Sequence, residues 1–202
     1  MGQRLVVTIK TNEKELAKIY YHWSAYTESA LYETKKIIDC IYNHTDETES
    51  ELLLRLVRFC EDNGGGIDGT DDASEYKYIQ SLYPNETFKT EGYSRSNGLI
   101  ALSEKNMVEM QSWSEGDVFI NIDTDEVDFH VYCSYDNIAD YFDERKEWDD
   151  DFNEDDFKNI PEFDFDLYHF DTKDIDSIIT QIDNSGHNDI IICNGEVCDF
   201  IA

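Results

Sequence analysis

Two mainly apolar stretches separated by polar residues open the chain. Residues 4–10 and 16–22 are rich in β-branched and aromatic side chains, and the polar residues 11–14 separate them. This pattern predicts an opening β-hairpin. From residue 28 the apolar positions recur every three or four residues instead, which is the period of a helix that buries one face.

Three helices are predicted in the part of the chain that follows. The first covers residues 28–43, and the second begins at Thr48-Glu-Ser-Glu51, which has the spacing of a capping box. Gly64 ends the second helix. A short aromatic helix is predicted over residues 73–83, directly before Pro84.

After Gly92 the period of the apolar positions changes from helical to alternating. This pattern predicts a meander of about four strands, at residues 98–103, 107–113, 117–122 and 127–133. A helix is predicted over residues 136–148, with Trp148 on its apolar side. The last part predicts a strand at 163–170, a helix at 173–183 capped by Thr172, and a hairpin of 189–193 and 196–201 around Asn194-Gly195.

The order of these elements predicts an α+β fold with a mainly antiparallel sheet, N-terminal helices and an acidic C-terminal half. Residues 1–92 form the hairpin and the helical part. Residues 93–202 form the antiparallel sheet with two helices and the acidic segment 149–159. A chain of this length fits one continuous domain or two packed lobes.

The negative charge of the chain limits the classes of function that are expected for it. The 202 residues include 46 acidic and 16 basic side chains, a formal net charge of −30 at pH 7. Residues 1–100 hold 17 acidic and 11 basic side chains, whereas residues 101–202 hold 29 and 5. Proteins that bind nucleic acid use clustered Lys and Arg, so direct nucleic-acid binding is not expected.

Neither a membrane segment nor a disulfide is predicted. No apolar run approaches the roughly 20 residues that cross a bilayer. Five cysteines at irregular spacings indicate reduced thiols and a cytoplasmic protein. The Asn194-Gly195 turn sets Cys193 opposite Glu196, so Cys193 and Cys198 are out of register for a disulfide.

The opening Met1-Gly2-Gln3-Arg4, the hairpin and the segment Tyr21-His22-Trp23 resemble a group of uncharacterised phage and prophage proteins. Those proteins begin Met-Gly-Asn-Arg and reach His-Trp-Asn-Gly-Gly at the end of the second strand, where this chain has Ser24-Ala25-Tyr26. The resemblance implies only an origin in a mobile element, and the group has no known activity that could be transferred to this chain. Together with the reduced cysteines, that origin predicts a location in the host cytosol.

Acidity and this resemblance together predict a protein that works by binding. A compact chain of this size is roughly 43 Å across, and about 25 phosphate charges occupy that length of B-DNA. The chain thus resembles acidic phage proteins that inhibit CRISPR–Cas effectors or restriction complexes by mimicking DNA. Its predicted partner is a basic nucleic-acid-binding host protein, a defence nuclease. No cofactor and no catalysis are expected, and a homodimer is an open alternative.

The candidate partner-binding surface is the densest acidic run and two aspartates beyond it. Its residues are Asp149, Asp150, Asp151, Glu154, Asp155, Asp156, Asp164 and Asp166. Gathering like charges costs stability, which a cationic partner would restore on binding. A solvated linker is the alternative for residues 149–159. Phe152 and Phe157 would instead pin the segment to the core or act as apolar anchors of an interface.

Calcium binding is the alternative function. Asp151, Asn153, Asp155 and Glu162 fall at positions 1, 3, 5 and 12 of an EF-hand-like loop. However, Asp156 stands where the loop needs glycine, and Pro161 lies inside it. Weak divalent binding is therefore favoured over a specific site. A protein of this kind would be a non-inhibitory Ca²⁺-binding or structural assembly module.

The known catalytic motifs do not occur in the sequence. The five histidines are scattered, without a His-Glu-x-x-His or nucleophile-elbow pattern. His22 with Cys40 or Cys60 is the arrangement that would build a Cys–His pair. Residues 63–70 are rich in glycine but lack the Lys-Ser/Thr of a phosphate-binding loop. They predict a helix end followed by a flexible loop.

Overall fold

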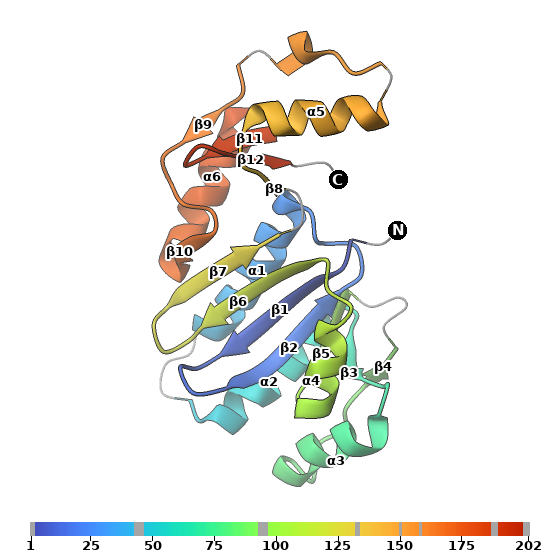
Figure 1. Cartoon of the computed structure of the whole chain (residues 1–202). Coiled ribbons are helices and arrows are strands. Elements are labelled where there is room, and N and C mark those ends of the chain that lie inside the picture. The colour runs from blue at the N-terminus through green and yellow to red at the C-terminus, as the bar shows by residue number, and fades with distance from the viewer. Residues whose placement is uncertain are drawn as a thin grey trace.

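A computed structural model describes residues 3–42, 47–92, 97–131, 134–149, 151–157, 159–186 and 190–199, without the side chains at positions 72, 134, 156 and 199. These residues form an α+β fold, as predicted, with a mostly antiparallel large sheet. A smaller sheet with its own helix lies beyond one end of the large sheet (Figure 1).

The large sheet joins strands from both halves of the chain. Its strands are β1 (Leu5–Lys10), β2 (Glu15–Tyr21), β3 (Gly66–Asp68), β4 (Thr90–Glu91), β5 (Asn97–Ala101), β6 (Gly116–Asn121), β7 (Glu126–His130) and β10 (His169–Asp171). Their order is β10-β7-β6-β1-β2-β5-β3-β4. β1 pairs antiparallel with β2, which confirms the opening hairpin, and parallel with β6.

Helices cover one face of the large sheet. α1 (Thr27–Tyr42), α2 (Glu49–Asp62) and α6 (Ile175–Ser185) share a buried cluster with the strands, and α1 and α2 lie behind the sheet in Figure 1. The predicted capping box is confirmed, since Thr48 and Glu51 bond to each other's backbone N–H. None of the described helices has both the length and the apolar composition that a bilayer span requires.

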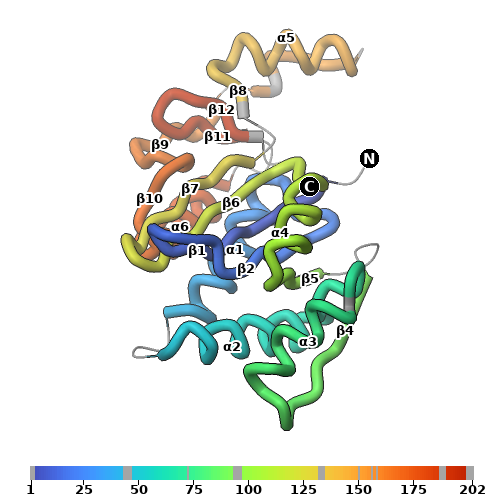
Figure 2. Tube along the Cα trace, turned by 60° about the horizontal axis from the view of Figure 1, so that its bottom comes forward, coloured from blue at the N-terminus to red at the C-terminus, as the bar shows by residue number. Residues whose placement is uncertain are grey.

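The helix α4 (Glu104–Gln111) packs on the opposite face over β2 and β5 (Figure 2). The strand predicted at 107–113 is therefore wrong, and of the four-stranded meander only the β6–β7 hairpin forms without interruption. Ser103 starts the helix, because its hydroxyl accepts the N–H of Asn106. Met107 and Met110, one turn apart, then reach Tyr20 in the second cluster.

The glycine-rich segment after α2 is a buried strand and not a flexible loop. β3 runs parallel to β4 and β5, and all of its residues are buried. A Cβ atom at Gly65 would collide with the carbonyl group of Gly98. Close backbone packing, not chain mobility, thus explains the glycine. The predicted aromatic helix follows as α3 (Asp72–Leu82).

The smaller sheet consists of β8 (Ser134–Tyr135), β9 (Glu162–Phe163), β11 (Ile190–Cys193) and β12 (Glu196–Asp199), in the order β8-β12-β11-β9. The predicted final hairpin is confirmed, with Cys193 opposite Glu196. Its turn residues Asn194 and Gly195 have φ angles of 48° and 87°, as this tight turn requires. Cys193 and Cys198 are free thiols, and Cys133 lies outside the described residues.

Two predictions for the C-terminal part need correction. The strand predicted at 163–170 is two strands, β9 and β10, which belong to different sheets. The chain turns between them because the Asp166 carboxylate accepts the N–H groups of Tyr168 and His169. Thr172 does not cap α6. It is buried in a 3₁₀ turn, η2 (Thr172–Asp174), that precedes the helix.

Candidate functional site: an acidic surface on the C-terminal lobe

The smaller sheet, the helix α5 (Ile138–Trp148) and the 3₁₀ turn η1 (Glu154–Phe157) form the C-terminal lobe. α5 packs on β8 and β12 and corresponds to the helix predicted at 136–148. Asn137 starts it, since its side-chain oxygen accepts the N–H groups of Ala139 and Asp140 at 2.9 and 3.1 Å. The lobe has a small buried cluster of its own, formed by Tyr141, Ile190 and Val197.

An aromatic cluster holds the acidic segment against α5. Tyr141 is 1% exposed, and its ring centroid lies 5.8 Å from that of Phe157 and 6.4 Å from that of Phe152. Phe142 contacts the same two rings. Residues 151–157 therefore pack on the lobe through their phenylalanines and do not form a solvated linker.

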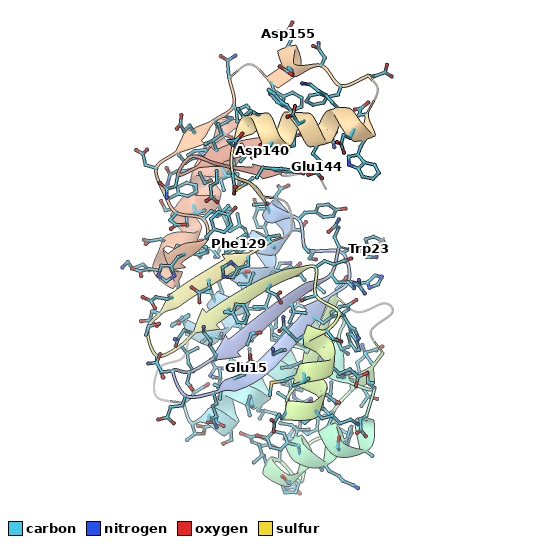
Figure 3. The ribbon with its side chains drawn as sticks, in the orientation of Figure 1. Glu15, Trp23, Phe129, Asp140, Glu144 and Asp155 are labelled. Atoms are coloured by element: carbon cyan, nitrogen blue, oxygen red, sulfur yellow. The ribbon has the colours of Figure 1, made fainter. Side chains whose placement is uncertain are left out.

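Carboxylates cover the outer surface of this scaffold. On α5 the exposed ones are Asp140, Asp143, Glu144 and Glu147, and on the following segment Asp149, Asp151, Glu154 and Asp155. Figure 3 places Asp140 and Glu144 along the helix and Asp155 on the segment above it. We call these eight residues the acidic surface.

Cations neutralise little of the acidic surface. The Lys146 ammonium contacts Glu154 and lies 3.9 Å from an oxygen of Asp143. The hydrogen bond to Glu154 raises the pKa of Lys146, which therefore stays charged. Within the described part of the chain, no ion pair involves Glu144, Glu147 or Asp151. Residues 134–166 as a whole contain fourteen acidic and three basic side chains.

Comparisons of the chain with protein-family models, with curated proteins and with solved structures found no match. The function of the acidic surface therefore has to be inferred from its geometry and charge.

The acidic residues predicted from the sequence do not all lie together. Asp149, Asp151, Glu154 and Asp155 belong to the acidic surface. Asp150 is outside the described residues, as is the side chain of Asp156. The acidic run itself thus contributes about half of the surface, and α5 contributes the other half.

Asp164 and Asp166 lie on a different part of the molecule, between β9 and β10. Both are exposed, and Asp166 also lines a cavity of about 440 Å³ at the junction of the lobe and the large sheet. His130 from the end of β7 and Glu196 from β12 line the same cavity. Asp166 therefore belongs to this junction and Asp164 to the end of β9, so neither comes from α5 or residues 149–155, which form the acidic surface.

The calcium candidates do not form an EF-hand-like loop. Residues 154–157 form η1 instead, and the side chain of Asn153 accepts the N–H of Asp155. Asp151, Asp155 and Glu162 are all exposed. Across the described residues, no three His, Cys, Asp or Glu side chains gather in a way that would hold a metal ion.

The Cys–His pair does not form among the described residues. The His22 ring bonds to the hydroxyl of Tyr20 at 2.7 Å and contacts the ring of Trp23. Burial raises the pKa values of the Cys40 and Cys60 thiols, so the reactive thiolate is disfavoured at both.

Sequence reasoning missed the α5 half of the acidic surface. Helical residues three and four positions apart are neighbours, and the spacing of Asp140, Glu144 and Glu147 contains that signal. The expectation that Trp148 lies on the apolar side of the helix is wrong, because its side chain is 82% exposed. Its position at the last residue of α5, beyond the cluster of Tyr141, explains the exposure.

Proposed function

We propose that this protein binds a basic nucleic-acid-binding host protein, namely a defence nuclease such as a CRISPR–Cas effector or a restriction complex. It inhibits that nuclease by occupying the surface that otherwise holds DNA or RNA. The observation that carries the proposal is the acidic surface, whose carboxylates are exposed and held on a packed scaffold, with Glu144, Glu147 and Asp151 outside every ion pair of the described residues. The resemblance to phage and prophage proteins supports the same setting.

The charge density of α5 suits this role. The helix rises about 1.5 Å per residue, so the stretch from Asp140 to Glu147 is about 10 Å long. It presents four carboxylates and the two cations Arg145 and Lys146 in that length, a net charge of −2. One strand of DNA carries about three phosphates over the same length, so a groove that accommodates a nucleic-acid backbone meets a negative charge of the same order on α5.

A cationic partner would also relieve repulsion within the lobe. Like charges three or four residues apart on a helix destabilise it, and Glu144 and Glu147 are such a pair. Association with a positively charged surface removes this repulsion and is accelerated by long-range attraction. Both effects weaken with salt, because exposed charges are screened within about 8–10 Å at physiological ionic strength.

The test is competition for DNA. Purified CRISPR–Cas effectors and restriction complexes are mixed with fluorescent target duplex, and its displacement by the protein is measured by anisotropy at low and high salt. We expect displacement from at least one nuclease, weakening as salt rises. The triple variant Glu144→Lys, Glu147→Lys and Asp151→Lys should lose it.

The matched control reverses three acidic residues on the other part of the molecule, Glu13→Lys, Asp62→Lys and Glu109→Lys. Each is at least partly exposed, and none forms an ion pair within the described residues. This control changes the net charge equally and should still compete. Equal potency of both triple variants, or no displacement of DNA from any nuclease, would refute the proposal. A thermal stabilisation by Ca²⁺ together with absent competition would favour a Ca²⁺-binding module.

A further inference from the structure

Trp148 is the most exposed of the large hydrophobic side chains on the described surface, at 82%. It ends α5, one turn after Glu144, and Glu147 and Asp149 are its chain neighbours. No described aromatic ring packs against it. An indole is thus presented to solvent among carboxylates.

Other aromatic residues of the chain contact neighbouring rings. Tyr141, Phe142, Phe152 and Phe157 pack on one another and hold the lobe together. Trp23, on the other part of the molecule, is 57% exposed but contacts the ring of His22 at 5.0 Å. Trp148 contributes little to the lobe core, so folding does not account for a large apolar side chain at this position.

The chemistry around Trp148 favours one kind of ligand group. The face of an indole attracts cations, and the guanidinium of arginine stacks on it while its N–H groups remain free to bond. A carboxylate one helical turn away lies about 5–6 Å from Trp148, between Cβ atoms. Carboxylates pair with guanidinium through two parallel hydrogen bonds, which an ammonium cannot form.

We infer that Trp148 is the anchor of the acidic surface and that it selects arginine over lysine on the partner. An arginine side chain stacks on the indole and bonds at the same time to Glu144 or Asp149. This inference rests on the proposed function, since it specifies which residues of a basic partner the acidic surface binds. Exposed tryptophans of this kind are the residues that dominate binding energy in many interfaces.

The probes for the test are labelled nona-arginine and nona-lysine peptides, which carry equal charge. Their affinities for the full chain and its variants are measured by fluorescence anisotropy. We expect the unmodified protein to prefer nona-arginine. Trp148→Ala should weaken nona-arginine binding by about tenfold or more and leave nona-lysine binding within about twofold. Trp148→Phe, which keeps an aromatic face, should retain most of the preference.

Trp23→Ala is the matched control, because it removes an exposed indole elsewhere, and it should change neither affinity. The inference is overturned if Trp148→Ala keeps the preference for arginine, or if it weakens both peptides equally. The Glu144→Lys, Glu147→Lys, Asp151→Lys protein separates the two proposals. If it binds both peptides normally, the proposal that the acidic surface binds a basic partner is refuted. If it loses binding of both peptides while Trp148→Ala changes neither affinity, only the inference about Trp148 is refuted.

Discussion

The large sheet and the C-terminal lobe differ in how far their carboxylates are paired with cations. On the large sheet the cations lie beside carboxylates, as in Arg4–Glu115 at 3.1 Å and Lys14–Glu49 at 2.8 Å. Lys18, almost fully buried, lies 3.1 Å from an oxygen of Glu15. In the lobe, the ion pairs of the described residues involve Lys146 alone. Solubility needs no such concentration of charge in one region, so the contrast favours a binding role for the lobe.

The two regions also differ in how they are packed. The large sheet has a continuous core to which the helices α1, α2, α3 and α6 contribute, and a second cluster under α4. The lobe has only a small cluster of its own around Tyr141, and its strands β11 and β12 add Ile191, Cys193 and Cys198 to the continuous core. We therefore expect substitutions that disturb packing to lower the free energy of unfolding most in the large sheet. Substitutions that change charge should act mainly on the lobe.

The largest effect is expected at Gly65, where the strand β3 meets β5. Gly65→Ala places a methyl group against the carbonyl of Gly98, and we expect a loss of about 4 kcal/mol in the free energy of unfolding. Urea denaturation followed by circular dichroism measures it. Gly92→Ala is the control, because its added Cβ meets no atom within 4 Å, and it should stay within about 0.5 kcal/mol. Equal stability of the two variants would contradict the close packing described for β3.

The next effect separates the lobe from the sheet. Tyr141→Ala removes the ring that Phe152 and Phe157 contact, at a cost of about 3 kcal/mol. Hydrogen exchange should then show loss of protection in α5 and little change in α1. Tyr141→Phe keeps the ring contacts and should retain most of the protection. Uniform deprotection of both helices would mean that the lobe and the sheet unfold as one unit.

Neutralising charges should change stability with opposite signs in the two regions. Glu144→Gln with Glu147→Gln removes repulsion near the end of α5 and should stabilise the protein by about 0.5 kcal/mol at low salt. Glu33→Gln with Glu61→Gln removes partners of Lys36 and Arg58 and should destabilise it by about the same amount. Thermal melts at low and at high salt measure both, and the two differences should shrink with salt. The same sign for both pairs would remove the contrast.

The smallest effect concerns pH at the edge of the large sheet. The His169 imidazole bonds to Asp128 at 2.9 Å, which raises the pKa of His169. Burial alone would raise the pKa of Asp128, but the bonds from His169 and Lys10 lower it. The attraction between the charged His169 imidazole and the Asp128 carboxylate therefore contributes fully to the stability of the folded protein between about pH 4 and pH 6.5.

This contribution is lost as the pH rises through the pKa of His169 in the folded protein, or falls through that of Asp128. The His169 side chain is 54% exposed, so solvent screening limits the effect to below about 0.5 kcal/mol. His169→Gln should lower the melting temperature at pH 6 more than at pH 9. The reverse order would show that the pair does not stabilise β10.

Local signals in the sequence were sufficient for the elements with clear start and stop chemistry. The hairpin of β1 and β2, the capping box of Thr48 and the turn at Asn194-Gly195 are all present. The predictions that were wrong concern segments whose secondary structure or strand pairing depends on tertiary packing. Residues 107–111 form part of a helix because Ser103 caps its start and the apolar surface of β2 and β5 packs against Met107 and Met110. The pairing of β3 with β5 joins residues more than thirty positions apart, which no local pattern reveals.

The acidic surface could be located only in part. A run of consecutive acidic residues is visible in any sequence, and it led to Asp149 and its neighbours. The carboxylates of α5 are interrupted by Tyr141 and Phe142, so their common surface emerges only when the helix is placed on its sheet. Asp164 and Asp166 follow the run in sequence but lie elsewhere, because the chain turns toward β10.

The parallel pairing of β1 with β6 has a consequence for the synthesis of the chain. Leu5 lies opposite Gly116, and Lys10 opposite Asn121. At ribosomal rates of roughly 5–20 residues per second, the central strand waits about 6 to 22 s for this partner to be made. During that time one edge of the first hairpin has no partner strand and is open to pairing with other nascent chains. The yield of native protein should therefore depend on chaperones that shield this edge during translation.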